Sequence, residues 1–178
     1  MPVQVRSAAE ADVDALIASN KVVQDLHAAA YPRDFKAVVD RAGMRAWFTS
    51  RLHEPNSVIA VAERNDLPAG YIWFELQTRP ETLFNLARHR IHLHHLSVVP
   101  NARRQGVATA VLQFIEQRAA DDGIADIMLD TWMANADALA CFTARGFAPL
   151  QMTFRKTLAR RASVAARGRP QSASAPCR

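Results

Sequence analysis

LSVVPNARRQGVAT, residues 96–109, is the stretch of this chain that decides the fold. Apolar residues run up to Pro100 and an apolar helical pattern follows the glycine, so the stretch predicts a strand, a short loop and a helix start. The first amides of a helix have no intrahelical acceptor and lie at the positive end of its dipole. Gly106 lets a ligand approach this backbone closely, and Arg103 and Arg104 add positive charge. The stretch therefore predicts an anion site, although an ordinary turn with two solvated arginines has the same local chemistry.

Strands and helices alternate around this stretch. We expect a strand over about 90–99, a helix over 107–122 that stops at Gly123, a strand over 124–132, a helix over 135–145 and a last strand over 147–156. Such alternation predicts a sheet with helices on both faces.

The first half of the chain adds a short strand, helical segments and a β-hairpin. Ser7 and Glu10 have the spacing of a capping box at a helix start. The expected strands are 3–6, 57–64 and 70–77, and residues 65–69 join the last two. The first expected helical stretch runs up to Tyr31 with a break after Asn20. A further helical turn or two is expected within 33–50. Together the elements predict an α/β (α+β) fold with a mixed, mostly antiparallel central sheet flanked by helices.

Composition and charge favour one domain with a distinct tail. A chain of 178 residues with 49% hydrophobic content can bury one sizeable core, which we expect in residues 1–158. Residues 155–178 hold seven of the 22 basic residues and no acid, which leaves 15 basic against 17 acidic residues in the rest. Residues 159–178 predict a basic, flexible tail, and no specific nucleic-acid partner is expected.

Neither a membrane span nor a disulfide framework is expected. No apolar run approaches the roughly 18–20 residues that a span needs, and charged residues interrupt the first twenty positions. Cys141 and Cys177 are the two cysteines, which is typical of free thiols. We therefore expect a cytoplasmic protein without a membrane partner.

Two patterns in this sequence resemble those of the GNAT superfamily of N-acetyltransferases. Arg103, Gly106 and Ala108 match its signature Arg/Gln-x-x-Gly-x-Gly/Ala. The second match uses Asn135, Ala138, Phe142, Gly146 and Phe147, in the order of the superfamily's C-terminal pattern. The resemblance covers about residues 3–156.

The resemblance implies roles for specific residues. In the family, the loop amides wrap the pyrophosphate of coenzyme A, and the preceding strand offers backbone groups to its pantetheine arm. By resemblance, cofactor-binding roles fall on Leu96, Ser97, Val98, Arg103, Arg104, Gln105, Gly106, Val107, Ala108, Thr109, Asn135 and Phe142. The family likeness implies acetyl-CoA as cosubstrate, no metal, direct transfer to an amine of a small molecule or peptide, and a monomer or homodimer.

Phe142 departs from the family pattern. Many members carry a tyrosine there that donates a proton to the leaving sulfur, and phenylalanine has no proton to donate. Either backbone dipoles and water handle the thiolate, or another side chain does. The alternative is a catalytically degenerate fold that acts as a coenzyme A-binding sensor or scaffold.

The histidines of residues 92–95 are candidates for the base that an amine nucleophile needs. Alternation places His92 and His94 on one side of the strand with Leu96 and Val98, and His95 on the other. A histidine can accept a proton at neutral pH. The pattern resembles the arylalkylamine N-acetyltransferase branch, which implies His92 and His94 as base residues.

Other roles for these side chains stay open. The histidines can instead be structural, and a metal cluster is disfavoured because no carboxylate lies close in sequence. Glu75 is the best carboxylate alternative as base. Aromatic residues near the expected acceptor side can line a pocket or pack in the core, and these are Tyr31, Phe35, Trp73 and Trp132.

Overall fold

The computed structural model describes residues 2–158, so the predicted tail at 159–178 lies outside the described residues. The chain divides into two units, Met1–Leu139 and Ala140–Arg178, and the sheet lies in the first. Its strands are β1 (Gln4–Ser7), β2 (Ser57–Arg64), β3 (Leu67–Arg79), β4 (Arg88–Val98) and β5 (Asp126–Leu129). The helices are α1 (Val13–Ala30), α2 (Arg41–His53), α3 (Val107–Asp121) and α4 (Ala136–Ala144), with 3-10 turns η1 (Glu10–Asp12) and η2 (Pro100–Ala102).

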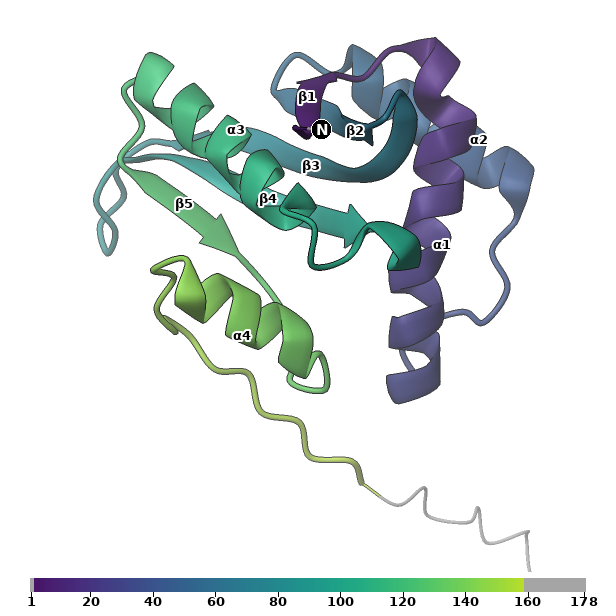
Figure 1. The fold of residues 1–178 in the computed structure, drawn as a ribbon. Helices are drawn as coiled ribbons and strands as arrows, with labels where there is room; N and C mark the ends of the chain where they lie inside the picture. The colour runs from purple at the N-terminus through teal and green to yellow at the C-terminus, as the bar shows by residue number, and fades with distance from the viewer. Residues whose placement is uncertain (1, 159–178) are drawn as a thin grey trace, which may run out of the picture. The chain divides into compact units, whose positions relative to one another are not determined.

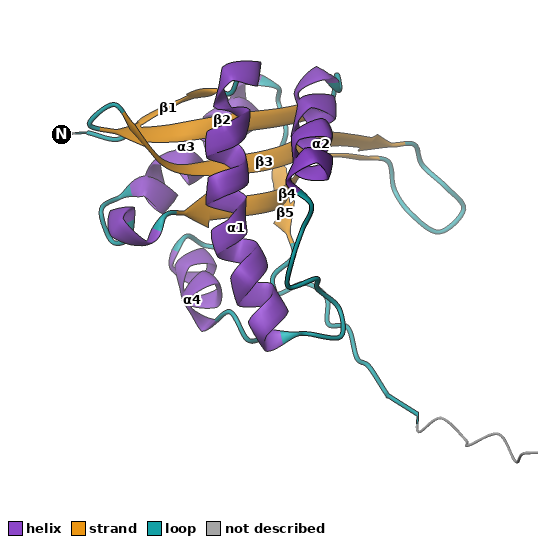
Figure 2. Ribbon diagram, turned by 90° about the vertical axis from the view of Figure 1, so that its right-hand side faces the viewer, coloured by secondary structure: helices purple, strands orange, loops and turns teal. Residues whose placement is uncertain are grey.

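The sheet has the order β1-β2-β3-β4-β5. The first three neighbouring pairs are antiparallel, and β4 and β5 are parallel. Helices α1 and α2 cover one face and α3 covers the other (Figure 1, Figure 2). This confirms the prediction of a mixed, mostly antiparallel sheet flanked by helices.

The core has a layer on each face of the sheet. One layer joins α1, α2, β2 and β3 through Val13, Leu16, Phe48, Ile59, Val61, Tyr71 and Trp73. On the other face the rings of Phe74 and Phe114 lie 6.5 Å apart, and Ile115 of α3 is fully buried. Burial of each large apolar side chain stabilises the fold by about 1.5–3 kcal/mol.

The β2–β3 hairpin is tighter than the sequence suggests. Asn65 and Asp66 both have left-handed backbone angles, with φ of 53° and 60°, and β3 starts at Leu67. Two residues with positive φ form the turn that matches the twist of antiparallel strands. The expected connection over 65–69 is therefore wrong in length, because Leu67 and Pro68 already pair with β2.

The N-terminal helices differ from expectation in three ways. Ser7 is not a helix cap, because it pairs with β2, and the Asp12 carboxylate instead accepts from the Ala9 amide at 2.8 Å. Helix α1 continues through Asn20 without a break, since the Asn20 amide group donates to the Tyr71 hydroxyl and does not compete for the helix backbone. Helix α2 is longer than a turn or two, and the Asp40 side chain caps its start.

The second half confirms β4, α3 and α4 but not the last strand. Gly123, with φ of 64°, ends α3 as predicted. Strand β5 is shorter than the expected 124–132. The strand expected over 147–156 is wrong, since residues 147–158 have no regular secondary structure. Pro149 has no N–H to donate, and within the described residues β5 pairs only with β4.

Candidate active site

The connection from β4 to α3 is a tight loop. After η2, Arg104 and Gly106 adopt left-handed backbone angles with φ of 61° and 84°. Gly106 precedes α3 and has no side chain to accept hydrogen bonds from the first amides of the helix. The first backbone hydrogen bond of α3 runs from the Ala110 amide to the Gly106 carbonyl at 2.9 Å. The helix start therefore presents backbone donors and the positive end of its dipole, the two elements of an anion site.

Side chains of this loop divide into exposed and buried groups. Arg103 and Arg104 are exposed, and the Gln105 side chain donates to the Asn101 carbonyl at 2.7 Å. Val107 is only 1% exposed as a whole residue, so it is part of the core. A Cβ added at Gly106 would meet nothing within 4 Å, which leaves open space next to the amides.

Strand β4 has an open edge beyond Leu93. Strand β5 pairs with β4 only over Arg90–Leu93, whereas β3 pairs with β4 as far as Val98. Within residues 2–158, no strand covers Leu96–Val98 on the β5 side. Leu96 and Val98 therefore have no pairing with β5, whereas Ser97 is buried and its hydroxyl donates to the Ser19 carbonyl at 2.7 Å.

A β-bulge interrupts the pairing of β3 and β4. Trp73 pairs with His95 and Phe74 pairs with Leu93, so His94 is an extra residue on β4. The rings of His94 and His95 lie 4.2 and 4.9 Å from the Trp73 ring. Both histidines therefore lie on the Trp73 side of the sheet.

The bulge decides which predicted histidine orientations hold. His92 and His94 do share a face, since their rings stack with centroids 4.6 Å apart, which confirms the prediction. The prediction that His95 faces the other way is wrong, because the extra residue shifts the alternation. Leu96 and Val98 follow the shifted alternation, so their expected place beside His92 is also wrong.

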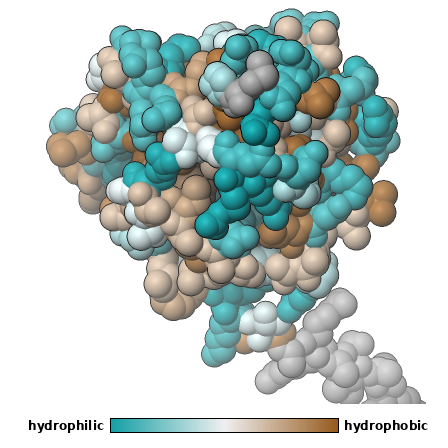
Figure 3. Space-filling view, in the orientation of Figure 1, coloured by the Kyte–Doolittle hydropathy of each residue, from teal (hydrophilic) through white to brown (hydrophobic). Residues whose placement is uncertain are grey.

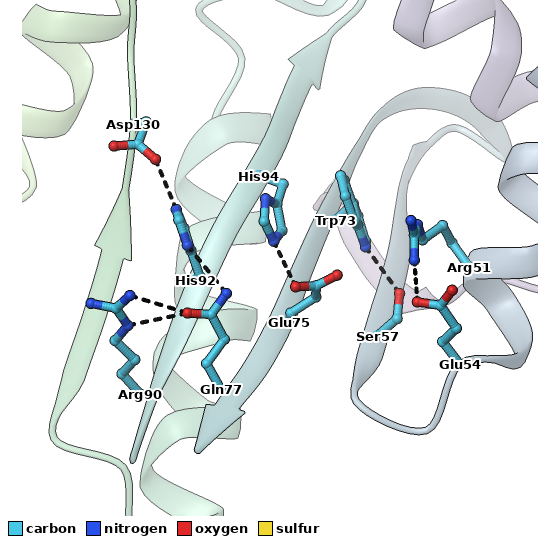
Figure 4. Close-up of polar contacts among 10 residues, drawn as sticks. All are labelled: Arg51, Glu54, Ser57, Trp73, Glu75, Gln77, Arg90, His92, His94 and Asp130. Carbon is cyan, nitrogen blue, oxygen red and sulfur yellow. Dashed lines mark hydrogen bonds and ion pairs between the residues drawn. The ribbon is translucent and has the colours of Figure 1, made fainter. Parts of the chain in front are cut away.

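Carboxylates flank the two stacked histidines (Figure 4). His92 Nε2 lies 3.0 Å from Asp130 Oδ2, and His94 Nε2 lies 3.0 Å from Glu75 Oε2. The His94 contact is an ion-pair distance without hydrogen-bond alignment. Glu75 and His94, alternatives in the sequence, are thus direct neighbours, with side chains 27% and 25% exposed.

The surroundings of His94 favour its neutral form. Burial lowers the pKa of His94 below 6.5, and this outweighs the opposite effect of Glu75. A neutral imidazole at pH 7 can accept a proton. The neutral form is the one that a general base needs, and the His94 Nε2 atom itself is buried beside Glu75.

The second sequence pattern forms the start and end of α4. The Asn135 side chain accepts from the Ala138 amide at 3.2 Å, so this residue is a helix cap. Past the end of α4, Gly146 has a left-handed φ of 85°, and the Phe142 and Phe147 rings lie 5.7 Å apart. Gly146 and Phe147 thus end the helix as the sequence suggests.

A comparison with protein families decides where the chain belongs. The model of the acetyltransferase (GNAT) family matches residues 21–147. The chain belongs to this family. N-acetyltransferase 8 of Homo sapiens is 32% identical over 105 residues, which cover 59% of this chain and 44% of that protein. Probable N-acetyltransferase family 8 member 5 of Mus musculus is 37% identical over 62 residues, covering 35% of this chain and 27% of that protein. The chain spans less than half the length of these curated relatives.

Solved structures share the fold of this GNAT family member. A tetramutant protein of Bacillus halodurans superposes with a TM-score of 0.81 at 16% identity, covering 87% of this chain and 99% of that one. A predicted acetyltransferase of Clostridium acetobutylicum, solved with acetyl-CoA, has a TM-score of 0.65 at 17% identity and covers 88% and 96% of the two chains.

This GNAT chain also contains a buried polar network that the sequence patterns do not predict. Tyr71 lies 2.9 Å from His95 Nδ1 through its hydroxyl, which also accepts from the Asn20 side chain at 2.8 Å. Burial lowers the pKa of His95 to about 4 and raises that of Tyr71, so the neutral hydroxyl donates to a neutral imidazole. The one hint of this network in the sequence is Asn20, a polar residue within the apolar helical pattern.

Tyr71→Phe tests the importance of this network for the fold. The substitution leaves the ring in place but removes the hydroxyl that binds Asn20 and His95, which then keep only their own contact of 3.4 Å. We expect a loss of about 2 kcal/mol in the free energy of unfolding, measured by urea denaturation. Tyr31→Phe is the matched control, because its hydroxyl accepts from the Ala134 amide at an exposed position. An equal loss in both variants would contradict the network.

Aromatic side chains form a separate cluster at the end of α1. The Trp132 ring lies 4.5 Å from Tyr31 and 5.1 Å from Phe35, and His27 lies 4.7 Å from Phe35. Among the ring contacts of residues 2–158, none joins Trp73 to this cluster. The structure thus brings three of the four predicted aromatic residues together and places the fourth, Trp73, against the histidines.

Proposed function

We propose that this chain transfers an acetyl group from acetyl-CoA directly to a primary amine of a small molecule or peptide. The observation that carries the proposal is the course of β4, which holds His94 at its bulge and leads along the open edge of Leu96–Val98 into the loop before α3. The names of the curated relatives and the acetyl-CoA in the Clostridium structure support the donor and the reaction.

The loop and the open edge fit the cosubstrate. Backbone amides from Arg103 to Thr109 would bind the pyrophosphate, with the exposed Arg103 and Arg104 adding charge. Backbone groups of Leu96–Val98 would bind the pantetheine arm, with Asn135 as a further contact. The thioester of acetyl-CoA supplies the acetyl group when bound.

His94 is the proposed base. It accepts the proton that the amine loses as the new N–C bond forms and the C–S bond breaks. Glu75 stabilises the protonated imidazole that results, and His92 with Asp130 can pass the proton to solvent. A backbone amide of Leu96–Val98 polarises the acetyl carbonyl.

The position at which many family members carry a tyrosine holds Phe142 in this chain, and phenylalanine cannot protonate the leaving thiolate. We propose that water protonates this sulfur after backbone dipoles stabilise its charge. The same observation favours the second candidate function, a degenerate fold that binds coenzyme A as a sensor or scaffold.

Turnover separates the two functions. The experiment measures release of the coenzyme A thiol from acetyl-CoA with a panel of primary amines, including peptides. We expect release that depends on the amine and yields acetylated product. Binding of acetyl-CoA without turnover on any amine would favour the sensor and contradict the enzyme.

Gly106→Val tests the coenzyme A site independently of the acceptor. A branched side chain is strained at φ of 84° and fills the open space beside the first amides of α3. We expect coenzyme A affinity, measured by isothermal titration calorimetry, to fall by about tenfold or more, as expected for the loss of one charge-assisted hydrogen bond. Gly123→Val has a similar backbone strain, with φ of 64°, at the other end of α3 and should leave affinity unchanged.

Residues 1–158 are proposed as the acetyltransferase domain and 159–178 as its basic tail. We propose a cytoplasmic location on the sequence evidence. None of the helices within residues 2–158 is long and apolar enough to cross a membrane, and no group of three or more metal-ligating side chains occurs in that range.

A further inference from the structure

The connection between β3 and β4 carries three apolar side chains in full contact with solvent. Leu83, Phe84 and Leu86 are 90%, 88% and 77% exposed. Figure 2 shows this connection projecting beyond α2, and Figure 3 shows hydrophobic residues at the left edge, where it lies in Figure 1. We call residues 80–87 the apolar tip. Three neighbouring exposed apolar side chains on a projection form a patch that water solvates poorly.

The apolar tip is a structured turn. The Thr82 amide donates to the Asn85 carbonyl at 2.9 Å, and the Thr82 hydroxyl accepts from the Asn85 and Phe84 amides at 3.0 and 3.3 Å. Arg88 donates to the Asn85 side chain at 3.0 Å. The turn therefore holds the apolar side chains outward, because its polar groups bond to one another.

Positive charge lies directly behind the tip. Arg79 and Arg88 are opposite one another across the β3–β4 ladder, a like-charge pair that destabilises a sheet. In the described part of the chain, neither one forms a salt bridge. Arg90 follows two residues along, and Glu81 is the one acid in residues 79–90. An anionic surface would relieve this repulsion.

We propose that the apolar tip inserts into the interface of an anionic lipid bilayer, with Arg79 and Arg88 at the headgroups. A projecting apolar tip with two arginines, Arg79 and Arg88, at its base fits a flat negative surface. A groove in a protein partner would need to be both apolar and lined with acidic residues. Interfacial segments bury their apolar side chains only about 5–10 Å deep, a depth that two or three strand residues span. This is peripheral binding, in contrast to the sequence expectation of no membrane partner.

Vesicle sedimentation of the full chain tests the proposal. The vesicles are phosphatidylcholine alone or with about one third phosphatidylserine. We expect binding to the anionic vesicles that weakens with added salt. Arg79→Gln with Arg88→Gln should reduce the partition coefficient by about 25-fold, since each arginine near such a surface contributes about fivefold. Equal binding to both vesicle types would overturn the proposal that Arg79 and Arg88 contact anionic headgroups.

A triple variant tests insertion of the tip. Leu83→Ser, Phe84→Ser and Leu86→Ser together should weaken binding to the anionic vesicles by about 100-fold. The matched control is Val38→Ser with Leu67→Ser, which changes two other exposed apolar residues, 84% and 67% exposed, and should bind as wild type. Equal binding by the triple variant and wild type would overturn the proposal. So would a dimer in solution that the triple variant abolishes, since a second copy of the chain would then be the occupant.

Discussion

His94→Ala is expected to lower kcat/KM for amine acetylation by about 10²- to 10⁴-fold, the usual contribution of a general base. The ring of His94 is stacked between those of Trp73 and His92, and its Nε2 lies 3.0 Å from Glu75. These contacts fix the position of the imidazole. His89→Ala is the control, because His89 is an exposed histidine on the same strand. Steady-state kinetics of both variants against one amine measure the effect.

The pH dependence distinguishes a base from a structural residue. An enzyme that needs neutral His94 gains activity as pH rises through the pKa of His94, which burial holds below 6.5. Glu75 raises that pKa, so Glu75→Gln should move the acidic limb of the kcat/KM profile to lower pH. A profile that is unchanged in both His94→Ala and Glu75→Gln would end the assignment of His94 as base.

Much of the fold could be predicted because local signals and tertiary structure agree. Gly123 stops α3 where the apolar helical pattern ends, and the stretch before Gly106 switches from strand to helix as its pattern indicates. Residues 147–156 show the limit of such signals. Their apolar alternation is typical of a strand, but a strand also needs a ladder partner, which is a tertiary property.

The site was less predictable than the fold, because one backbone irregularity reorganises it. Strict alternation separates His95 from His94, whereas the bulge places both on the Trp73 side. A bulge is decided by the pairing of two strands, and no residue type in 92–95 requires it. The pairing also explains the contact of Glu75 with His94, since Glu75 is opposite His92 in the ladder.

Gly70→Ala is expected to destabilise the fold by about 3 kcal/mol, the upper end for overpacking. A Cβ at residue 70 would lie 2.4 Å from the Ser97 carbonyl oxygen and 3.2 Å from a Val107 methyl group. The Ser97 carbonyl belongs to the backbone of a β ladder, so it cannot rotate away from the added methyl group as a side chain would. Thermal unfolding should show a fall of about 6–12 °C in Tm, at about 2–4 °C per kcal/mol for a chain of this size.

The same substitution should also weaken coenzyme A binding, because the strain falls on the open edge. Gly70 pairs with Val98, and Val107 is the first residue of α3, so separating the strands moves the two backbone segments proposed to hold the cosubstrate. Gly123→Ala is the control: its φ of 64° imposes about 1–2 kcal/mol of backbone strain, but nothing lies within 4 Å of its Cβ. Calorimetry should show reduced affinity in Gly70→Ala alone. Equal losses of stability in the two variants, with unchanged affinity for coenzyme A, would contradict this prediction. The contact between β3 and β4 at Gly70 would then not be needed to position the cosubstrate site.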